Sequence, residues 1–486
     1  MATTLLWHDY ETWGLNPRVD RAAQFAAIRT DEDLNIIGEP IELFCKPSRD
    51  FIPHPESMMI TRLNPFDVDE KGLNEAAFFA AIHEAMSVPG TCSVGYNNLR
   101  FDDEVSRFGF YRNLIDPYSR EWQNGNSRWD LVDLVRMTYA LRPEGIVWPE
   151  REPGIPSFRL DQLSVANGIG HDNAHDALSD VHATIGLAKA IKQAQPKLYD
   201  YYFGFRAKTT ATSMMNLISK DTLLHISGMY PSSIGCIAPV MPLATHPKNK
   251  NEYIVYDLRH DPERLINNSA QDIAKTLFTP NAELPEGVER IALKGIHINK
   301  SPALAPTNTL SDEQAAKWDI DWDIIEKHRK KLLKVCGLGM GIEKKVVQIY
   351  AEGRPNNKSD PDSALYEGFI DNGDRKICND ILAQSTEEKL VTKPPFKDKR
   401  LQTIYSRYLA RNWPDQLDSE ALQSWEEFCK ARLLDGDHGC EFTLHDYIEK
   451  REQLDSAEIM AEDTEAKYQL LEELDRWIDE QLPIHN

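Results

Sequence analysis

The sequence has few cysteines and no long apolar run. Seven cysteines are scattered over 486 residues and none forms a C-x-x-C pair, which argues against a zinc ribbon and a disulfide framework. No stretch of about 18 apolar residues occurs, so a membrane-spanning helix is not expected. The N-terminus lacks the basic and apolar regions of a signal peptide. These absences predict a protein of the reducing cytoplasm without a membrane partner.

Positive charge is also scarce. The chain holds 77 Asp and Glu against 55 Lys and Arg, which gives a formal net charge of −22. On net charge alone, nucleic acid is not an expected partner. The deficit is uneven, because residues 401–486 hold 21 acidic and only 8 basic side chains. Global charge is therefore a poor guide to the local potential of the rest of the chain.

Hydrophobic patterning divides the chain into three parts. In the first, strand-like runs precede helical patterns, which together indicate an α/β domain. Short β-rich runs broken by Pro, Asn and Gly then predict a small barrel or twisted sheet over about 220–300, and helical patterns dominate the remainder. The expected strands of the first part are 4–9, 22–30, 36–46 and 91–96. The expected domains are 1–195, 196–350 and 351–486.

Two acidic residues end the first expected strand. Asp9 and Glu11 are two positions apart and therefore project from the same face of a strand. Two such carboxylates repel each other unless a cation or a proton lies between them, and oxygen-rich sites suit Mg²⁺ or Mn²⁺. An isolated D-x-E pattern is more often a solvent-facing strand end, so a metal site needs support from further motifs.

Two further acidic motifs stand at expected helix starts. Asp102 closes the motif N-x-x-R-F-D, in a position where acidic residues also serve as helix caps. Asp180 follows His175 in the motif H-x-x-x-x-D on the last helix of the first domain. Asp180 lies beside an apolar helix face, where an acid needs a partner.

Taken in this order, the three motifs resemble the DEDDh branch of the DEDD exonuclease superfamily. Longer segments, including HDYET, GYNNLRFDDEV, PSFRL and NAHDALSD, are similar to the bacterial exonuclease I family over nearly the whole chain. The resemblance implies a ribonuclease-H-like exonuclease domain, an SH3-like barrel and an all-helical C-terminal extension. It also implies processive 3′→5′ hydrolysis of single-stranded DNA to 5′-mononucleotides, with a role in DNA repair and recombination.

The resemblance assigns roles to the acidic motifs. Asp9, Glu11, Asp102 and Asp180 match the metal-binding acids, and His175 matches the general base. The implied cofactor is a pair of Mg²⁺ ions, with Mn²⁺ as a substitute, that clamps the scissile phosphate and activates a water. A neutral histidine suits the removal of a proton from that water.

A single strand of DNA requires cations for its phosphates and aromatic faces for its bases. Arg159 matches the position at which the family contacts the substrate phosphate, and Glu11 is expected to touch substrate as well as metal. The other expected substrate-binding residues are Arg107, Tyr118, Trp122, Arg136, Lys208, Asn251, Lys294 and Asn299. We therefore expect a positive path along the first two domains and an acidic excess on the helical extension.

Two alternatives stay open at this point. The catalytic motif does not choose the sugar, so a DEDDh ribonuclease or proofreading exonuclease is one alternative, although the long chain beyond residue 200 argues against a compact ribonuclease. The other is a non-catalytic scaffold for single-stranded nucleic acid, which the presence of all four acids and the histidine disfavours. The resemblance further implies the bacterial single-stranded DNA-binding protein as a partner, and it favours a monomer.

Overall fold

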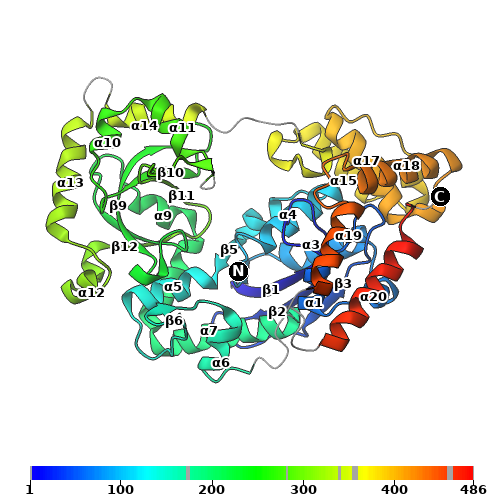
Figure 1. The fold of residues 1–486 in the computed structure, drawn as a ribbon, viewed down its shortest axis with the longest axis horizontal. Helices are drawn as coiled ribbons and strands as arrows, with labels where there is room; N and C mark the ends of the chain where they lie inside the picture. The colour runs from blue at the N-terminus through cyan, green and yellow to red at the C-terminus, as the bar shows by residue number, and fades with distance from the viewer. Residues whose placement is uncertain are drawn as a thin grey trace. The chain divides into compact units, whose positions relative to one another are not determined.

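The chain divides into two compact units, each built from segments that are distant in sequence (Figure 1). The computed structural model describes residues 3–170, 176–280, 283–337, 341–352, 359–456 and 464–484. The first unit comprises Met1–Ser127, His171–Ala183 and Asn357–Asn486, and the second comprises Arg128–Gly170 and Thr184–Asn356. Among the helices of these described ranges, none is long and apolar enough to cross a membrane.

A mixed sheet with the strand order β3-β2-β1-β4-β5 carries the first unit. Its strands are β1 (Thr4–Thr12), β2 (Ala22–Thr30), β3 (Ile41–Phe44), β4 (Thr91–Gly95) and β5 (Ser127–Asp130). β1 runs antiparallel to β2 and parallel to β4, and its run from Leu5 to His8 is buried, as is typical of a central strand. The expected strand at 36–46 is shorter in the structure, because Ile36 makes only an isolated bridge with Thr30.

Helices from both ends of the chain belong to the first unit. They are α1 (Pro55–Thr61), α2 (Pro65–Lys71), α3 (Glu75–Ser87), α4 (Asp102–Arg112), α15 (Asn372–Leu382), α16 (Thr386–Val391), α17 (Lys399–Asn412), α18 (Ser419–Asp435), α19 (Leu444–Ser456) and α20 (Thr464–Gln481). Helix α3 begins where the side chain of Asn74 accepts a hydrogen bond from the backbone of Ala77, which satisfies one of the free amides of a helix start. A further helix, α7 (Ala177–Ala194), begins in the first unit and continues in the second.

The C-terminal helices share hydrophobic cores with the N-terminal part of the chain. Trp13 and Met58 pack in one cluster with Leu433 and Trp477, and Figure 1 shows the red helix α20 beside α1. A second cluster joins Phe108 of α4 to residues of α17. The expected helical extension is therefore confirmed, and its helices pack onto the sheet-bearing part of the first unit.

The second unit contains an antiparallel sheet with the strand order β11-β10-β9-β8-β12. Its strands are β8 (Leu223–Ile226), β9 (Ile237–Thr245), β10 (Glu252–Asp257), β11 (Leu293–His297) and β12 (Ala303–Pro306). The β-rich character expected for about 220–300 is confirmed, but the pattern did not predict β9, which contains Pro239 and Pro242. The register of β9 with β10 shifts beside Pro242, and such irregularities are where strands accommodate proline.

The second unit also holds short helices and a small hairpin. These elements are α5 (Leu131–Leu141), β6 (Glu150–Glu152), β7 (Ile155–Pro156), α6 (Leu160–Ala166), α8 (Pro196–Phe203), α9 (Lys208–Met214), α10 (Glu263–Asn267), α11 (Ala270–Leu277), α12 (Asp312–Lys317), α13 (Trp322–Val335) and α14 (Ile342–Glu352). The amphipathic helices α11 and α14 pack against each other, and α14 also packs against β9. The second unit therefore combines the β-rich region with helices on either side of it in sequence.

Candidate active site

Three carboxylates meet at the end of β1. Asp9 and Glu11 from β1 and Asp180 from the first turn of α7 each place one oxygen within 4.8 Å of the others. The alternation of a strand explains why Asp9 and Glu11 share a face, and their register against β2 is regular up to Glu11, where a bulge follows. The expected grouping of these three acids is therefore what the structure contains.

Asp102 joins this site through the main chain of β1. It is the first residue of α4, and its Oδ1 accepts a hydrogen bond of 3.1 Å from the backbone N–H of Tyr10, which lies between Asp9 and Glu11. The neighbouring Asp103, which is also buried, instead forms an ion pair of 2.6 Å with Arg120. This geometry favours Asp102 over Asp103 as the fourth acid of the site.

The acids oppose one another's ionisation. Burial, followed by the charges of Asp102, Glu11 and Asp180, raises the pKa of Asp9 well above its ordinary value. Burial and the charges of Asp180 and Asp102 raise the pKa of Glu11 from 4.5 to about 9. Such a group holds protons near neutral pH unless a cation replaces them. An all-oxygen set of this kind fits a hard divalent cation.

Asp176 is a fifth acid that the sequence motifs did not single out. It raises the pKa of both Asp9 and Glu11, and its Oδ1 accepts a hydrogen bond of 3.1 Å from Gln24 of β2. Its Oδ2 accepts from the backbone N–H of Ser179, 3.1 Å away, in the manner of a helix cap. Its place directly after His175 in the same motif was the available signal. His175 itself lies outside the described residues.

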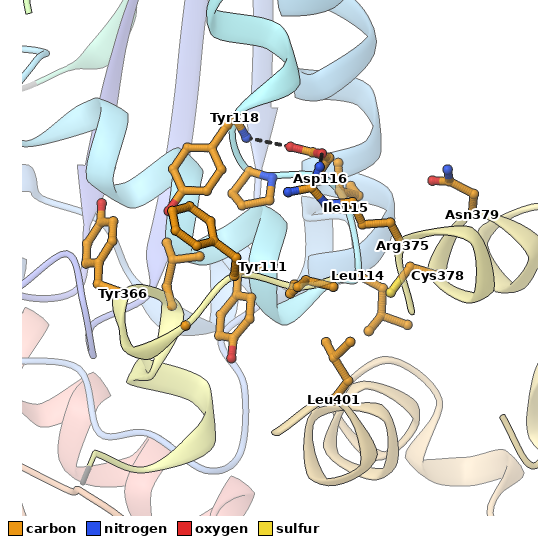
Figure 2. A pocket seen from close by; sticks show the side chains of 15 residues that line it. Tyr111, Leu114, Ile115, Asp116, Tyr118, Tyr366, Arg375, Cys378, Asn379 and Leu401 are labelled. Atoms are coloured by element: carbon orange, nitrogen blue, oxygen red, sulfur yellow. Dashed lines mark hydrogen bonds and ion pairs between the residues drawn. The ribbon is translucent and has the colours of Figure 1, made fainter. Parts of the chain in front are cut away.

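Besides Glu11, three of the expected DNA-binding residues lie in the first unit. Arg107 is buried and forms ion pairs of 2.7 Å with Glu104 and Glu121, and its guanidinium carbon lies 5.4 Å from the ring centroid of Tyr118. Tyr118 lines a pocket together with Tyr111, Tyr366 and other side chains (Figure 2). Trp122, in contrast, is 66% exposed. Only Trp122 of these three presents most of its side chain to solvent.

The remaining expected DNA-binding residues lie in the second unit. The side chain of Arg159 is 64% exposed and lies 2.8 Å from Asp161, whereas Arg136 is largely buried in an ion pair of 2.7 Å with Asp133. The structure brings Lys208 and Asn251 together in a hydrogen bond. The Nζ of Lys294 lies 4.0 Å from the ring centroid of Tyr230, and the backbone carbonyl of Asn299 accepts a hydrogen bond from Arg128.

Family models cover the chain in three consecutive segments. A model described as "Exonuclease" matches residues 6–188. The model of the exonuclease I SH3-like domain matches 206–352, and that of the exonuclease I C-terminal domain matches 359–481. These matches confirm the expected fold class of an exonuclease domain, an SH3-like domain and a helical C-terminal domain.

Individual relatives are similar to this chain in sequence and structure over most of its length. Exodeoxyribonuclease I of Escherichia coli K12 is 45% identical over 426 residues, which are 87% of this chain and 89% of the relative. The solved E. coli exonuclease I in complex with a dA16 oligonucleotide superposes with a TM-score of 0.92 at 42% identity, covering 98% of this chain and 99% of that one. Exonuclease I of Methylocaldum szegediense gives a TM-score of 0.92 at 44% identity, with 99% and 100% coverage.

Two other comparisons bear on the alternatives and the partners. An oligoribonuclease of Shewanella loihica is 30% identical, but only over 140 residues, or 25% of this chain. Other solved exonuclease I structures include a zinc-bound E. coli complex with single-stranded DNA and an SSB/exonuclease I complex. This likeness to a ribonuclease covers only a quarter of the chain, and the chain as a whole belongs to the exonuclease I family of exodeoxyribonucleases.

Proposed function

We propose that the chain hydrolyses single-stranded DNA processively from its 3′ end and releases 5′-mononucleotides. The observation that carries the proposal is the convergence of Asp9, Glu11 and Asp180 beside Asp102, in a chain that matches exonuclease I from end to end. A compact ribonuclease would leave the SH3-like and C-terminal segments without a role. A non-catalytic scaffold would have no use for a cluster of partly buried acids that oppose one another's charge.

The four acids are the residues that would hold the divalent cations on which the family depends. We propose two Mg²⁺ ions, with Mn²⁺ as a substitute, and when bound such ions lower the pKa of a water and stabilise charge on the phosphate and the leaving 3′-oxygen. The oxygen-only donors and the raised pKa values of Asp9 and Glu11 support a cation of this class.

The chain's own side chains would align the substrate and move the proton. His175 takes the proton from the attacking water, a role suited to a group that titrates near neutrality. Glu11 contacts the terminal nucleotide, and Arg159, which is exposed, binds a backbone phosphate. The other DNA contacts in this proposal are Arg107, Tyr118, Trp122, Arg136, Lys208, Asn251, Lys294 and Asn299.

We also propose partners, a cellular role, an oligomeric state and domain boundaries for the enzyme. The relatives support single-stranded DNA and the SSB protein as macromolecular partners. We also propose a cytoplasmic role in DNA repair and recombination, which the family resemblance implies. We further propose that the chain works as a monomer with domains at 1–195, 196–350 and 351–486. The ranges matched by the three family models support these boundaries.

Degradation of end-labelled substrates tests this function. Single-stranded DNA, single-stranded RNA and blunt duplex DNA are labelled at the 3′ or the 5′ end and incubated with the protein and Mg²⁺. We expect immediate release of the 3′ label as a mononucleotide from single-stranded DNA, late release of the 5′ label, and much slower loss from RNA and duplex DNA. Equal or faster loss from RNA would instead support the ribonuclease alternative, and no loss from any substrate would support the scaffold.

A further inference from the structure

Asp102 and Asp103 are adjacent buried acids with different partners. Asp102 faces β1, where it accepts the hydrogen bond from Tyr10, whereas the side chains of Asp103 and Arg120 are both 0% exposed and 2.6 Å apart. Adjacent residues of a helix project about 100° apart. Holding Asp103 in the interior therefore fixes the direction in which Asp102 leaves the first turn of α4.

Arg120 is well placed to act as a fixed anchor. Its backbone carbonyl accepts a hydrogen bond from the side chain of Asn126, 3.3 Å away, and the Oδ1 of Asn126 in turn accepts from the backbone of Thr91 at the start of β4. The start of α4 is held as well, because the backbone N–H of Asp103 donates to the carbonyl of Asn98. The ion pair thus connects two backbone segments that are each tied down independently.

Stability alone is a weak reason for such a pair. Removing two charges from water is costly, and replacing a buried ion pair with apolar groups of similar size is often neutral or stabilising. Two guanidinium nitrogens of Arg120, Nε and Nη1, are buried without a hydrogen-bond partner among the described residues. Burying the Asp103–Arg120 pair therefore costs free energy that the hydrogen bond between the two side chains does not fully offset.

We infer that Arg120 and Asp103 are positioning residues for Asp102. The inference rests on the proposed role of Asp102 as a metal-binding acid. Arg120 touches neither the acid cluster nor the substrate in this account and acts through Asp103 on the first turn of α4. Partners that orient metal ligands in this way contribute about 10- to 100-fold to metal affinity or activity when they are replaced.

The test uses the double variant Asp103→Asn/Arg120→Met, which removes both charges and leaves no buried charge unpaired, together with Arg120→Lys, which keeps the positive charge. The matched control is Glu75→Gln/Arg112→Met, which neutralises another buried pair of the first unit, 3.0 Å long. For each protein we measure kcat on single-stranded DNA, the Kd for Mn²⁺ by calorimetry, the Kd for single-stranded DNA in EDTA, and the midpoint of thermal unfolding. Activity is measured at a temperature well below the unfolding midpoint of each protein.

We expect the Asp103/Arg120 double variant to lose about 10- to 100-fold in kcat and to bind Mn²⁺ correspondingly more weakly. Its DNA affinity in EDTA should change by less than about twofold, and Arg120→Lys should recover part of kcat. The Glu75/Arg112 control variant should leave kcat, the Mn²⁺ affinity and the DNA affinity unchanged. Wild-type kcat and Mn²⁺ affinity in the Asp103/Arg120 double variant, or a loss confined to DNA affinity, would overturn the inference.

Failure of the proposed function would look different. The Asp102→Asn variant is measured in parallel and should lose both Mn²⁺ affinity and activity. If Asp102→Asn is as active as wild type, the role of Asp102 is wrong. If Asp102→Asn is inactive while the Asp103/Arg120 variants are normal, only the positioning role is wrong.

Discussion

Glu11 is held in surroundings that oppose its charge. Its carboxyl group is buried at the end of β1 and faces Asp180 and Asp102. Because its pKa rises from 4.5 to about 9, the metal-free folded protein retains a proton at pH values where the unfolded chain has lost it. The native state of the metal-free protein therefore becomes less stable as pH rises between these two values, and binding of a divalent cation reverses the loss.

The variant Glu11→Gln tests whether ionisation of Glu11 destabilises the metal-free protein. In EDTA, the wild-type unfolding midpoint should fall as pH rises from about 5 to 9, and the fall should be smaller in the variant because it has one fewer group to ionise. Added Mg²⁺ should raise the wild-type midpoint at pH 8 and raise that of the variant much less. Thermal unfolding followed by circular dichroism measures both effects. A midpoint in the variant with the same pH and Mg²⁺ dependence as wild type would contradict the account.

Trp122 is the most exposed aromatic side chain among the proposed DNA contacts. We expect Trp122→Ala to weaken binding of single-stranded DNA by about 1–3 kcal/mol, or roughly 5- to 150-fold, because a stacked base loses its platform. Since the side chain is largely exposed, the unfolding midpoint should barely change. Fluorescence anisotropy in EDTA gives the affinity. Trp122→Phe is the control and should retain most of it, and an unaltered affinity in Trp122→Ala would remove this residue from the DNA site.

At the scale of elements, a buried charge network joins α17 to the N-terminal part of the first unit. Arg411 pairs with both Asp50 and Asp362, and Arg407 adds an ion pair of 3.0 Å to Asp362. Burial alone would raise the pKa of Asp362, but the two arginines outweigh it and hold that pKa well below its ordinary value. The network thus stabilises the fold while Asp362 is ionised.

Replacing Asp362 should therefore destabilise the first unit strongly. We expect Asp362→Ala to lower the free energy of unfolding by about 3–5 kcal/mol, because it removes one of the carboxylates that compensate the buried charges of Arg407 and Arg411. Glu473→Gln is the control on α20, where a partly exposed ion pair with Arg476 should contribute less than about 1 kcal/mol. Denaturant unfolding measures both, and equal effects would show that the buried network does not differ from a surface pair.

The same network predicts an acid sensitivity. Because the pKa of Asp362 is lowered in the folded state, its contribution is fully present above the unfolded value of about 3.9 and is lost as pH falls below it. Unfolding midpoints measured from pH 6 to pH 3 should fall less steeply in Asp362→Ala than in wild type. Parallel curves for the two proteins would contradict this assignment.

The sequence predicted elements where periodicity is strong. The run at 22–30 has apolar residues at six of its nine positions and forms β2 with the expected limits. No strand was expected at β9, because proline usually interrupts a strand; Pro242 is accommodated beside a shift in register.

The site residues also divide into those that the sequence could predict and those that it could not. Asp9 and Glu11 could be paired from strand alternation alone, whereas the addition of Asp102 and Asp180 relied on the order of motifs that resembles a family. The places of Asp176 and Arg120 could not be predicted. Their partners, Gln24 and Asp103, are separated from them in sequence by 152 and 17 residues, and only the folded chain brings them together.

At the scale of the whole molecule, the net charge of −22 does not describe the DNA-binding surface. The acidic excess is concentrated in residues 401–486, and the acids at the end of β1 would face cations, which change the local sign. Binding of single-stranded DNA should therefore show the salt dependence of a protein that contacts phosphates, in spite of the overall negative charge.

This salt dependence can be assigned to residues. The logarithm of the association constant should fall linearly with the logarithm of NaCl concentration, and Arg159→Ala should reduce the slope by about 0.7, the value of one phosphate contact on a single strand. Arg476→Ala, which changes a half-exposed arginine of α20, is the control and should leave the slope unaltered. Affinity that is independent of salt in the wild type would contradict a phosphate-binding path.

We expect the acids that meet at the end of β1 to remove nucleotides from a 3′ end with the help of divalent cations. The most direct test is the rate of release of a 3′-terminal label from single-stranded DNA, with Mg²⁺ or with EDTA, by wild type, Asp180→Asn and the surface control Asp200→Asn. We expect release only with Mg²⁺, a loss of more than about 100-fold in Asp180→Asn, beyond what residues that merely support a ligand contribute, and wild-type rates in Asp200→Asn. Release that continues in EDTA, or that Asp180→Asn leaves unchanged, would contradict the account.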